Sequence, residues 1–325
     1  MAQPQTPPEF SLFLEGVYLL TDGGYLLLAN GGGGDISDSA IQTQFKYVLD
    51  VGAVTPSPIG AFELFNVYKE PTANLFALQT SNGNFITAVD GGGLTTDVLH
   101  TDAVSIGAWE QFRIAQTGPS GAFSVSIQTS SNNFLTAVGA GGKTTDAIHS
   151  DATKVGSWET FFIRKWGDPG HQSPVASEFF IVDASKNQAI AARGGGGQTQ
   201  NTIQFAGTNG NIPIDWARFT LIPQSNGSYA LQTINENYVT AVDGGGLDYG
   251  TESSDNIHTD ATVASTWEQF NFASPFDDGT FAIQTSKGYY LGKRTFGGAA
   301  QGEYSTDISD LSAASRFWLI PAAFF

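Results

Sequence analysis

Internal repetition constrains the fold of this chain more than any other feature. Three segments are nearly identical, and each contains a Gln-Thr pair, then Thr-Ala-Val, and closes on Trp-Glu-x-Phe: residues 76–112, 125–161 and 229–270. Weaker copies occupy residues 18–65, 180–219 and 281–317. The closing tetrapeptides begin at residues 62, 109, 158, 216, 267 and 314, so the period is about 50 residues with one longer step. A unit of this length cannot bury its hydrophobic face alone, and the copies must therefore pack on one another.

The six copies form two sets of three. Repeats one and four share a run of four glycines (Gly31–Gly34 and Gly194–Gly197), and repeats two and five share Thr-Ala-Val-Asp-Gly-Gly-Gly-Leu. This pairing indicates a three-repeat domain that was duplicated whole. The long step contains a Gly/Pro-rich segment that is typical of a linker. We therefore expect one domain over residues 10–168, a linker over 169–175 and a second domain over 176–325.

Each repeat predicts four short strands. In repeat two, an alternating strand begins at Phe76, a polar turn containing Asn-Gly follows, and a second strand begins at Phe85. A glycine run, a third strand near Val98-Leu99 and a fourth strand after Trp-Glu-x-Phe complete the unit. No segment has a sustained helical period. The sequence therefore predicts an all-β protein of two tandem β-trefoil domains, each with three four-stranded repeats.

The aromatic residues that recur at one position in each repeat are expected to fill a pseudo-threefold core. These include the phenylalanines that end the closing tetrapeptides and the tryptophans that begin four of them, namely Trp109, Trp158, Trp216 and Trp267. A residue that occupies the same structural position in every copy is more typical of packing than of ligand binding.

Charge and composition exclude several classes of function. The chain has 14 Lys+Arg against 31 Asp+Glu, a net charge of −17, and no basic tail. Nucleic acids and anionic membranes need clustered cations, so neither is an expected partner. No apolar stretch approaches the roughly 20 residues that cross a bilayer, and the first residues lack the pattern of a signal peptide. We expect a cytoplasmic protein or one released without a visible signal; the absence of Cys excludes disulfides and thiolate sites.

The pattern Leu-Gln-Thr-x-Asn-Gly-x-Phe/Tyr-x-Thr-Ala-Val-x-Gly-Gly-Gly, closing on Trp-Glu-x-Phe, resembles the fascin-like β-trefoil repeats of the actin-crosslinking superfamily. The resemblance covers all six repeats, about 300 of the 325 residues. It implies the trefoil fold and actin binding. The chain departs from fascin in having two domains instead of four and few basic residues, and it lacks the Gln-x-Trp of ricin-type sugar-binding trefoils. No site residues transfer from either family.

A second motif, Asp-x-(Leu/Ile)-His-(Thr/Ser)-Asp-Ala, contains histidines and occurs in repeats two, three and five. It places Asp97, His100 and Asp102, then Asp146, His149 and Asp151, then Asp255, His258 and Asp260. Imidazole and carboxylate suit several divalent metals. On an extended strand, however, His100 and Asp102 share a face and Asp97 lies opposite, so only two ligands converge. A hydrogen-bonded hairpin corner, a polar ligand pocket and a metal site stay open, with the corner favoured and no metal or other cofactor expected.

The glycine runs and the recurring glutamates favour structural roles. No Gly-Lys-Ser/Thr and no helix pattern follows a glycine run, so a loop with positive φ or a close backbone approach explains the glycines better than a phosphate site. Glu110, Glu159 and Glu268 lie in near-identical contexts, whereas an acid and a base need different ones. We expect them to be outward strand residues. No nucleophile elbow is present, and we expect no enzyme.

Repeated polar loops with aromatic residues are what shallow sugar sites use, because hydroxyl groups bind Asp and Asn while an apolar sugar face stacks on a ring. The candidate ligand-binding residues are Asn84, Asp90, His100, Asp102, Asn133, His149, Asp151, Asn237, Asp243, His258 and Asp260. Repeats two and five carry the fuller sets, and repeat three has Gly139 where they have Asp.

These observations favour a non-catalytic, multivalent carbohydrate-binding protein of the lectin type, with a defensive or insecticidal lectin as one form of it. Actin-filament binding or crosslinking is the alternative that the resemblance implies, although acidic filaments would repel a chain of net charge −17. A structural or assembly protein is the third possibility. The partners expected are therefore glycans or actin filaments.

Overall fold

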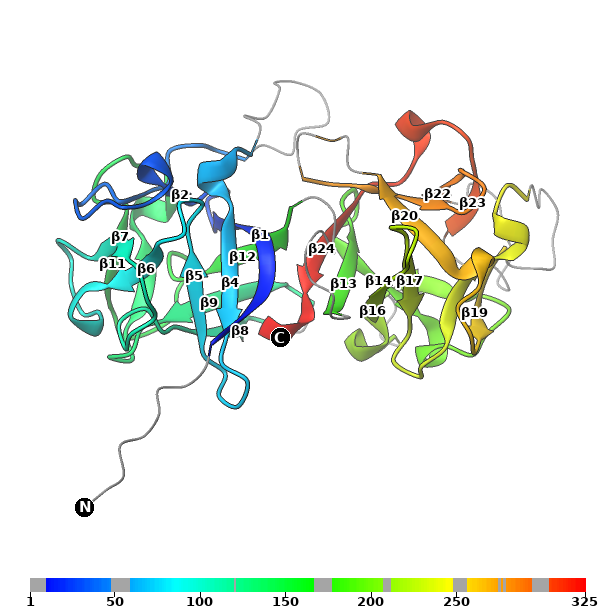
Figure 1. Cartoon of the computed structure of the whole chain (residues 1–325), viewed down its shortest axis with the longest axis horizontal. Helices are drawn as coiled ribbons and strands as arrows, with labels where there is room; N and C mark the ends of the chain where they lie inside the picture. The colour runs from blue at the N-terminus through cyan, green and yellow to red at the C-terminus, as the bar shows by residue number, and fades with distance from the viewer. Residues whose placement is uncertain are drawn as a thin grey trace, which may run out of the picture. The chain divides into compact units, whose positions relative to one another are not determined.

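The computed structural model describes residues 10–47, 59–119, 121–166, 177–206, 212–247, 256–273, 276, 279–293 and 304–325 (Figure 1). Contacts between Cα atoms divide the chain into two compact units. Unit 1 comprises residues 1–118, 122–164 and 324–325, and unit 2 comprises residues 119–121 and 165–323. The linker predicted at residues 169–175 lies outside the described residues.

Unit 1 contains three sets of four strands, which Figure 1 colours from blue to green. They are β1 (Ser11–Thr21), β2 (Leu28–Ala29), β3 (Ile41–Gln42) and β4 (Phe65–Lys69); β5 (Phe76–Gln79), β6 (Phe85–Ala88), β7 (Leu99–Ala103) and β8 (Arg113–Thr117); and β9 (Ser124–Gln128), β10 (Phe134–Ala137), β11 (Ile148–Ala152) and β12 (Phe161–Lys165). Each set is one sequence repeat, and the predicted strands of repeat two agree with the observed ones to within a few residues.

The first and fourth strands of each set form a closed barrel. Strand β1 pairs antiparallel with β4, β4 with β5, and β8 with β9. In the second set, mutual backbone hydrogen bonds of 2.8 Å between Phe76 and Phe112 join the first strand to the residue before the fourth. In the third set, Phe161 of β12 pairs with Val125 of β9. The pairing of β12 with β1 closes the barrel. The second and third strands form three hairpins, β2–β3, β6–β7 and β10–β11. A six-stranded barrel with three hairpins is a β-trefoil.

Unit 2 repeats this arrangement with twelve further strands. They are β13 (Ser177–Asp183), β14 (Gln188–Ala192), β15 (Ile203–Phe205) and β16 (Arg218–Pro223); β17 (Tyr229–Gln232), β18 (Tyr238–Ala241), β19 (Ile257–Ala261) and β20 (Gln269–Ala273); and β21 (Ala282–Thr285), β22 (Tyr290–Lys293), β23 (Tyr304–Ile308) and β24 (Phe317–Pro321). Pairings β13–β16, β16–β17, β17–β20, β20–β21 and β24–β13, with a bridge between Phe281 and Phe317, close the second barrel. The all-β prediction of two β-trefoils is confirmed.

Helical structure is limited to short 3-10 turns within the residues that the structure describes. Several follow the second strand of a repeat: η1 (Asn30–Gly32), η3 (Val89–Gly91), η4 (Val138–Ala140), η5 (Arg193–Gly195) and η8 (Val242–Gly244). The others are η2 (Ala61–Glu63), η7 (Ile214–Ala217), η9 (Thr266–Glu268), η10 (Leu311–Ala313) and η11 (Ala322–Phe324). None of these helices is long or apolar enough to cross a membrane.

The phenylalanines of the closing tetrapeptides fill the barrel cores, as predicted. Phe65, Phe112 and Phe161 in unit 1, and Phe219, Phe270 and Phe317 in unit 2, are 0–1% exposed. The core prediction for the tryptophans is wrong. Trp109, Trp158 and Trp267 are 45–47% exposed, and Trp216 is partly exposed. The tryptophan precedes the strand and lies in a turn, so only the phenylalanine three residues later enters the barrel wall facing inward.

Candidate functional site

The glycine run of one repeat packs against the first hairpin turn of the next repeat, and we call this contact a junction. The last glycine of a run donates its N–H to the third strand of the following repeat: Gly34 to Thr101 O at 2.6 Å, and Gly93 to Ser150 O at 2.7 Å. Gly142 of repeat three donates its N–H to Thr43 O of repeat one at 2.9 Å, so the three junctions of unit 1 form a closed ring. Unit 2 has the same bonds from Gly197 and Gly246.

Two properties of the backbone require glycine at the junctions. Gly92 has φ +100°, and a Cβ added to it would lie 2.4 Å from Thr129 Oγ1. The equivalent distance is 2.2 Å for Gly33 against Thr80, and 2.6 Å for Gly245 against Thr285. Positive φ and close approach are the two explanations that the sequence favoured over a phosphate loop, and both are confirmed.

Two junctions are closed by an asparagine amide. Asn82 donates from Nδ2 to Gly31 O at 3.0 Å and to Gly33 O at 3.3 Å. Asn235 in unit 2 donates from Nδ2 to Gly194 O at 2.9 Å. In both cases the first residue of the turn in left-handed conformation is a glycine, with φ +61° at Gly31 and +68° at Gly194. We call these the closed junctions.

The junctions that begin in repeats two and five have an aspartate at the position where the closed junctions have glycine. Asp90 has φ +54° and Asp243 has φ +56°, and both side chains are exposed. The asparagine is also replaced: Ser131 donates its backbone N–H to Gly91 O at 3.0 Å, and Lys287 donates its own to Gly244 O at 3.3 Å. We call these the open junctions.

The two open junctions differ in what the aspartate contacts. Within the described part of the chain, the carboxylate of Asp90 takes part in no hydrogen bond or ion pair. The carboxylate of Asp243 lies 3.3 Å from Lys287 Nζ, and both side chains are about half exposed. A non-glycine residue in the left-handed region is strained, and at Asp90 no side-chain hydrogen bond or ion pair among the described residues compensates for that strain.

An exposed aromatic ring stands beside the glycine runs of repeats one and two. Trp109 Cδ1 lies 3.5 Å from the position a Cβ would take on Gly91, and the Trp109 carbonyl accepts the N–H of Ala88 at 2.9 Å. Phe62 has the same place beside Gly32 in repeat one and is 45% exposed. Trp109 therefore presents about half of its surface to solvent next to Gly91, the residue that follows Asp90.

The Asp/His motif forms a hook within its own hairpin. His100 Nε2 lies 2.7 Å from Asp97 Oδ1, and His149 Nε2 lies 2.7 Å from Asp146 Oδ1. The prediction that Asp97 lies opposite His100 is wrong, because Asp97 is not in the strand: its φ of +52° turns the side chain back toward the histidine. The His149 hydrogen bond, aided by Lys143, holds the pKa of Asp146 below its ordinary value.

Repeat four makes the same hook from uncharged residues. Gln204 donates from Nε2 to Asn201 Oδ1, and Asn201 has φ +52°. Neither a metal nor a titratable group is needed for this geometry, which favours the hairpin-corner interpretation of the motif. In repeat five, His258 Nδ1 lies 3.8 Å from Asp260 Oδ1, and Asp255 lies outside the described residues.

Two of the three predicted asparagines, Asn84 and Asn133, donate their amides to backbone carbonyls. Asn84 donates from Nδ2 to Asp102 O at 3.2 Å, and Asn133 donates to Asp151 O at 3.3 Å. Asn84 precedes β6 and Asp90 follows it, so these two candidates stand at opposite ends of the strand. Asn237 is partly exposed beside Gly197, 3.7 Å from the position of its added Cβ.

The glutamates of the closing tetrapeptides are not outward strand residues, and that prediction is wrong. Glu110 is 7% exposed; its Oε1 accepts the Thr87 hydroxyl at 2.6 Å and its Oε2 accepts the Gly107 N–H at 2.7 Å. Glu159 and Glu268 bind the equivalent partners, Thr136 with Gly156 and Thr240 with Ser265. Each carboxylate ties the turn of its tetrapeptide to the second strand of its own repeat.

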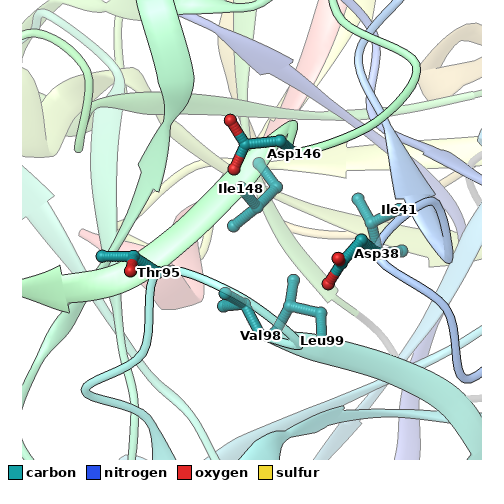
Figure 2. Close-up of a pocket in the computed structure, with 7 residues that line it drawn as sticks. All are labelled: Asp38, Ile41, Thr95, Val98, Leu99, Asp146 and Ile148. Atoms are coloured by element: carbon teal, nitrogen blue, oxygen red, sulfur yellow. The ribbon is translucent and has the colours of Figure 1, made fainter.

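A small hollow lies where the three hairpins of unit 1 meet (Figure 2). Aliphatic side chains line most of it, with polar groups around them: Ile41, Val98, Leu99, Ile148, Asp38, Thr95 and Asp146. The carboxylate of Asp38 is already used, because its Oδ1 accepts the Asp97 N–H at 2.6 Å. No group of three or more metal-ligating side chains occurs within the described ranges. The hollow is therefore the packing centre of the three hairpins.

Sequence reasoning found Asp90 and Asp243 but missed Trp109, Ser131 and Lys287. The signal was present in the repeats: wherever Asp replaces Gly after Ala-Val, the turn of the next repeat has Ser or Lys in place of Asn. The two positions lie about 40 residues apart, and only the junction brings them together.

Comparison with known proteins adds no family assignment. No family model and no curated protein matches the chain. Among solved structures it is similar to a mosquitocidal holotoxin (10% identity, TM-score 0.37), with 97% of this chain covered; the chain spans 36% of that protein's length. It is similar to the designed threefold-symmetric ThreeFoil (13% identity, TM-score 0.35), covering 46% of this chain and 96% of ThreeFoil.

A third similar structure is SeviL bound to an asialo-GM1 saccharide (10% identity, TM-score 0.32), covering 47% of this chain and 98% of SeviL. With all three TM-scores below 0.5, our fold assignment rests on the strand pairing of the chain itself. The resemblance to fascin-like repeats is supported only as far as the β-trefoil.

Proposed function

We propose that this chain is a non-catalytic carbohydrate-binding protein and that its sites are the two open junctions, one in each unit. The observation that carries the proposal is Asp90. It is exposed, it has φ +54°, and no group in the described residues bonds to it. Repeats one, three and four have glycine at this position, so the fold does not require an aspartate there.

Backbone strain that stabilises no side-chain hydrogen bond or ion pair among the described residues, such as the left-handed conformation of Asp90, is a reason to look for a ligand. The Asp90 carboxylate is exposed on a turn that backbone hydrogen bonds hold against the next repeat. A carboxylate accepts hydrogen bonds from two adjacent sugar hydroxyls, and the exposed Trp109 offers a flat surface for the apolar face of a sugar ring. A shallow site of this kind needs no deep pocket.

Two sites on one chain suit multivalent binding. A single shallow site binds weakly, and two sites that engage one glycan-coated surface gain avidity without new contacts. Of the residues predicted from sequence, Asp90 and Asp243 belong to this proposal. The side chains of Asn84, His100, Asn133 and His149 bond within their own hairpins instead.

A glycan array with the full-length chain tests the proposal. We expect selective binding that falls by about tenfold or more in the double variant Asp90→Gly, Asp243→Gly, because both carboxylates are lost while glycine suits both turns. The matched control is Asp22→Asn, which removes an exposed carboxylate that lies away from the open junctions and bonds no group in the described residues. Full binding by the double variant would overturn the proposal, and a blank array followed by co-sedimentation with filaments would favour the actin alternative.

A further inference from the structure

The two open junctions occupy equivalent places but differ in one cation. Lys287 and Ser131 stand at the same position, since the backbone N–H of each bonds the carbonyl of the glycine that follows the aspartate. In unit 2 the Lys287 ammonium lies 3.3 Å from Asp243 Oδ2. In unit 1, Ser131 has no ammonium group to place beside the carboxylate of Asp90 as Lys287 does beside Asp243. Asp90 therefore has no cation partner in the described residues.

We propose that the open junction of unit 1 selects a protonated amino sugar, and that Lys287 occupies the corresponding ammonium position in unit 2. The inference rests on the proposed function and names the class of sugar. Lys287 shows in the same chain which chemical group this turn accepts: an ammonium that bonds an aspartate held in left-handed conformation. In unit 1 that group must come from the ligand.

The surroundings of Asp90 favour a cation over a neutral or acidic sugar. A carboxylate without a counter-charge repels a sugar acid, and it bonds an ammonium more strongly than a hydroxyl because the bond is charge-assisted. The exposed face of Trp109 attracts a nearby ammonium through its ring electrons and still accepts the apolar face of the sugar. The net charge of −17 also attracts a polycation and raises its rate of association.

The matching ligand is an oligosaccharide that carries free amino groups, such as a β-1,4-linked glucosamine oligomer. Acetylation of the same oligomer removes the charge and keeps the rings, which gives a matched pair of probes. Two exchange variants test the role of the cation. Ser131→Lys supplies unit 1 with the internal ammonium, and Lys287→Ser removes it from unit 2.

Isothermal titration with the glucosamine tetramer and with its N-acetylated counterpart, at mildly acidic pH, is the test. We expect the wild-type chain to bind one glucosamine tetramer, about tenfold tighter than the acetylated one. Ser131→Lys loses this binding, and Lys287→Ser binds two tetramers per chain. Asp22→Asn, which lowers the negative charge by the same amount as Asp90→Asn, keeps the wild-type affinity, whereas Asp90→Asn does not.

The outcomes separate this inference from the proposed function. Equal affinity for the two tetramers, or an unchanged stoichiometry in both exchange variants, overturns the amino-sugar inference and leaves carbohydrate binding standing. Equal loss of affinity in Asp22→Asn and Asp90→Asn assigns the binding to net charge alone and also overturns it. Selective binding of neutral glycans that is lost in Asp90→Gly supports the proposed function without the inference.

Discussion

At the scale of single residues, the junctions are governed by which positions tolerate a Cβ. Gly92 and Gly139 both have positive φ, but their surroundings differ: an added Cβ would meet Thr129 Oγ1 at 2.4 Å at Gly92, and nothing within 4 Å at Gly139. The first position is restricted by backbone conformation and by packing, and the second by conformation alone.

We therefore expect Gly92→Ala to lower the free energy of unfolding by about 3 kcal/mol, the sum of backbone strain and an overpacked contact. Gly139→Ala should cost about 1 kcal/mol, since only left-handed strain applies. Urea denaturation of the two variants beside wild type measures the difference. Equal losses in the two variants would contradict the packing explanation.

Asp90 offers the opposite test at the position equivalent to Gly139. Asp90→Gly relieves left-handed strain and adds flexibility to the unfolded chain, so we expect stability to change by no more than about 0.5 kcal/mol. Glycan binding by unit 1 should fall all the same. A large loss of stability in urea would show that Asp90 holds the fold together, and it would remove the argument that its strain serves a ligand.

The tryptophans show what residue patterns fail to reveal. Trp109 and Phe112 recur with equal regularity, yet Phe112 is buried and Trp109 is 46% exposed. Recurrence reports a shared position in the fold and carries no information on the direction of the side chain in a turn. On a regular strand, the alternation of faces would have shown which side chain faces the core. The tetrapeptide, however, bends immediately before β8.

At the scale of elements, glutamates fasten the closing turns of repeats two, three and five to a hairpin strand. Glu110 receives one bond from Thr87 and one from the Gly107 backbone, and both partners would be left unpaired without it. We expect Glu110→Ala to destabilise the protein by about 2 kcal/mol. Asp22→Ala, at an exposed carboxylate with no partner among the described residues, should be neutral in the same thermal denaturation experiment. A stable Glu110→Ala protein would contradict this assignment.

The hooks of repeats two and four allow an exchange between charged and uncharged pairs. Repeat two uses Asp97 with His100, and repeat four uses Asn201 with Gln204 in the same backbone conformation. We expect His100→Ala to cost about 1 kcal/mol in urea denaturation, and the double variant Asp97→Asn, His100→Gln to restore most of that loss. If the double variant were as unstable as His100→Ala, the imidazole would have a role beyond the hook.

The strands themselves were predictable because the repeats supply several versions of each one. Alternation from Phe76 and the polar Asn-Gly turn fixed β5 and β6 to within a residue. The candidate site was only half predictable. Asp90 stands out by comparison of repeats, but its neighbours come from the next repeat, and pairing them requires the barrel to be closed.

At the scale of the whole molecule, several hydrogen-bonded carboxylates make stability depend on pH. The pKa values of four groups are lowered by hydrogen bonds, chiefly from the Asn30 amide to Asp35, the Ala73 N–H to Glu70, His149 to Asp146 and the Ser312 N–H to Asp310. A lowered pKa in the folded state means that the charged form is favoured by folding. Their contribution is complete above the ordinary carboxyl pKa.

We therefore expect the melting temperature to hold near neutral pH and to fall as the pH drops from the ordinary carboxyl range through the lowered folded values. A series of thermal melts into acid measures this decline. Asp310→Asn should make it shallower, because one of the contributing groups is removed. A melting temperature that rises steadily into acid would mean that relief of the net charge outweighs these bonds.

The ring of junctions in unit 1 has no natural beginning. The bond from Gly142 to Thr43 is the counterpart of those from Gly34 and Gly93, and β12 pairs with β1 to close the barrel. The closed ring of three repeats therefore does not depend on which repeat comes first in the chain. A circular permutation of unit 1 that began with repeat two and finished with repeat one would therefore move the ends of that unit and leave every one of its junctions in place.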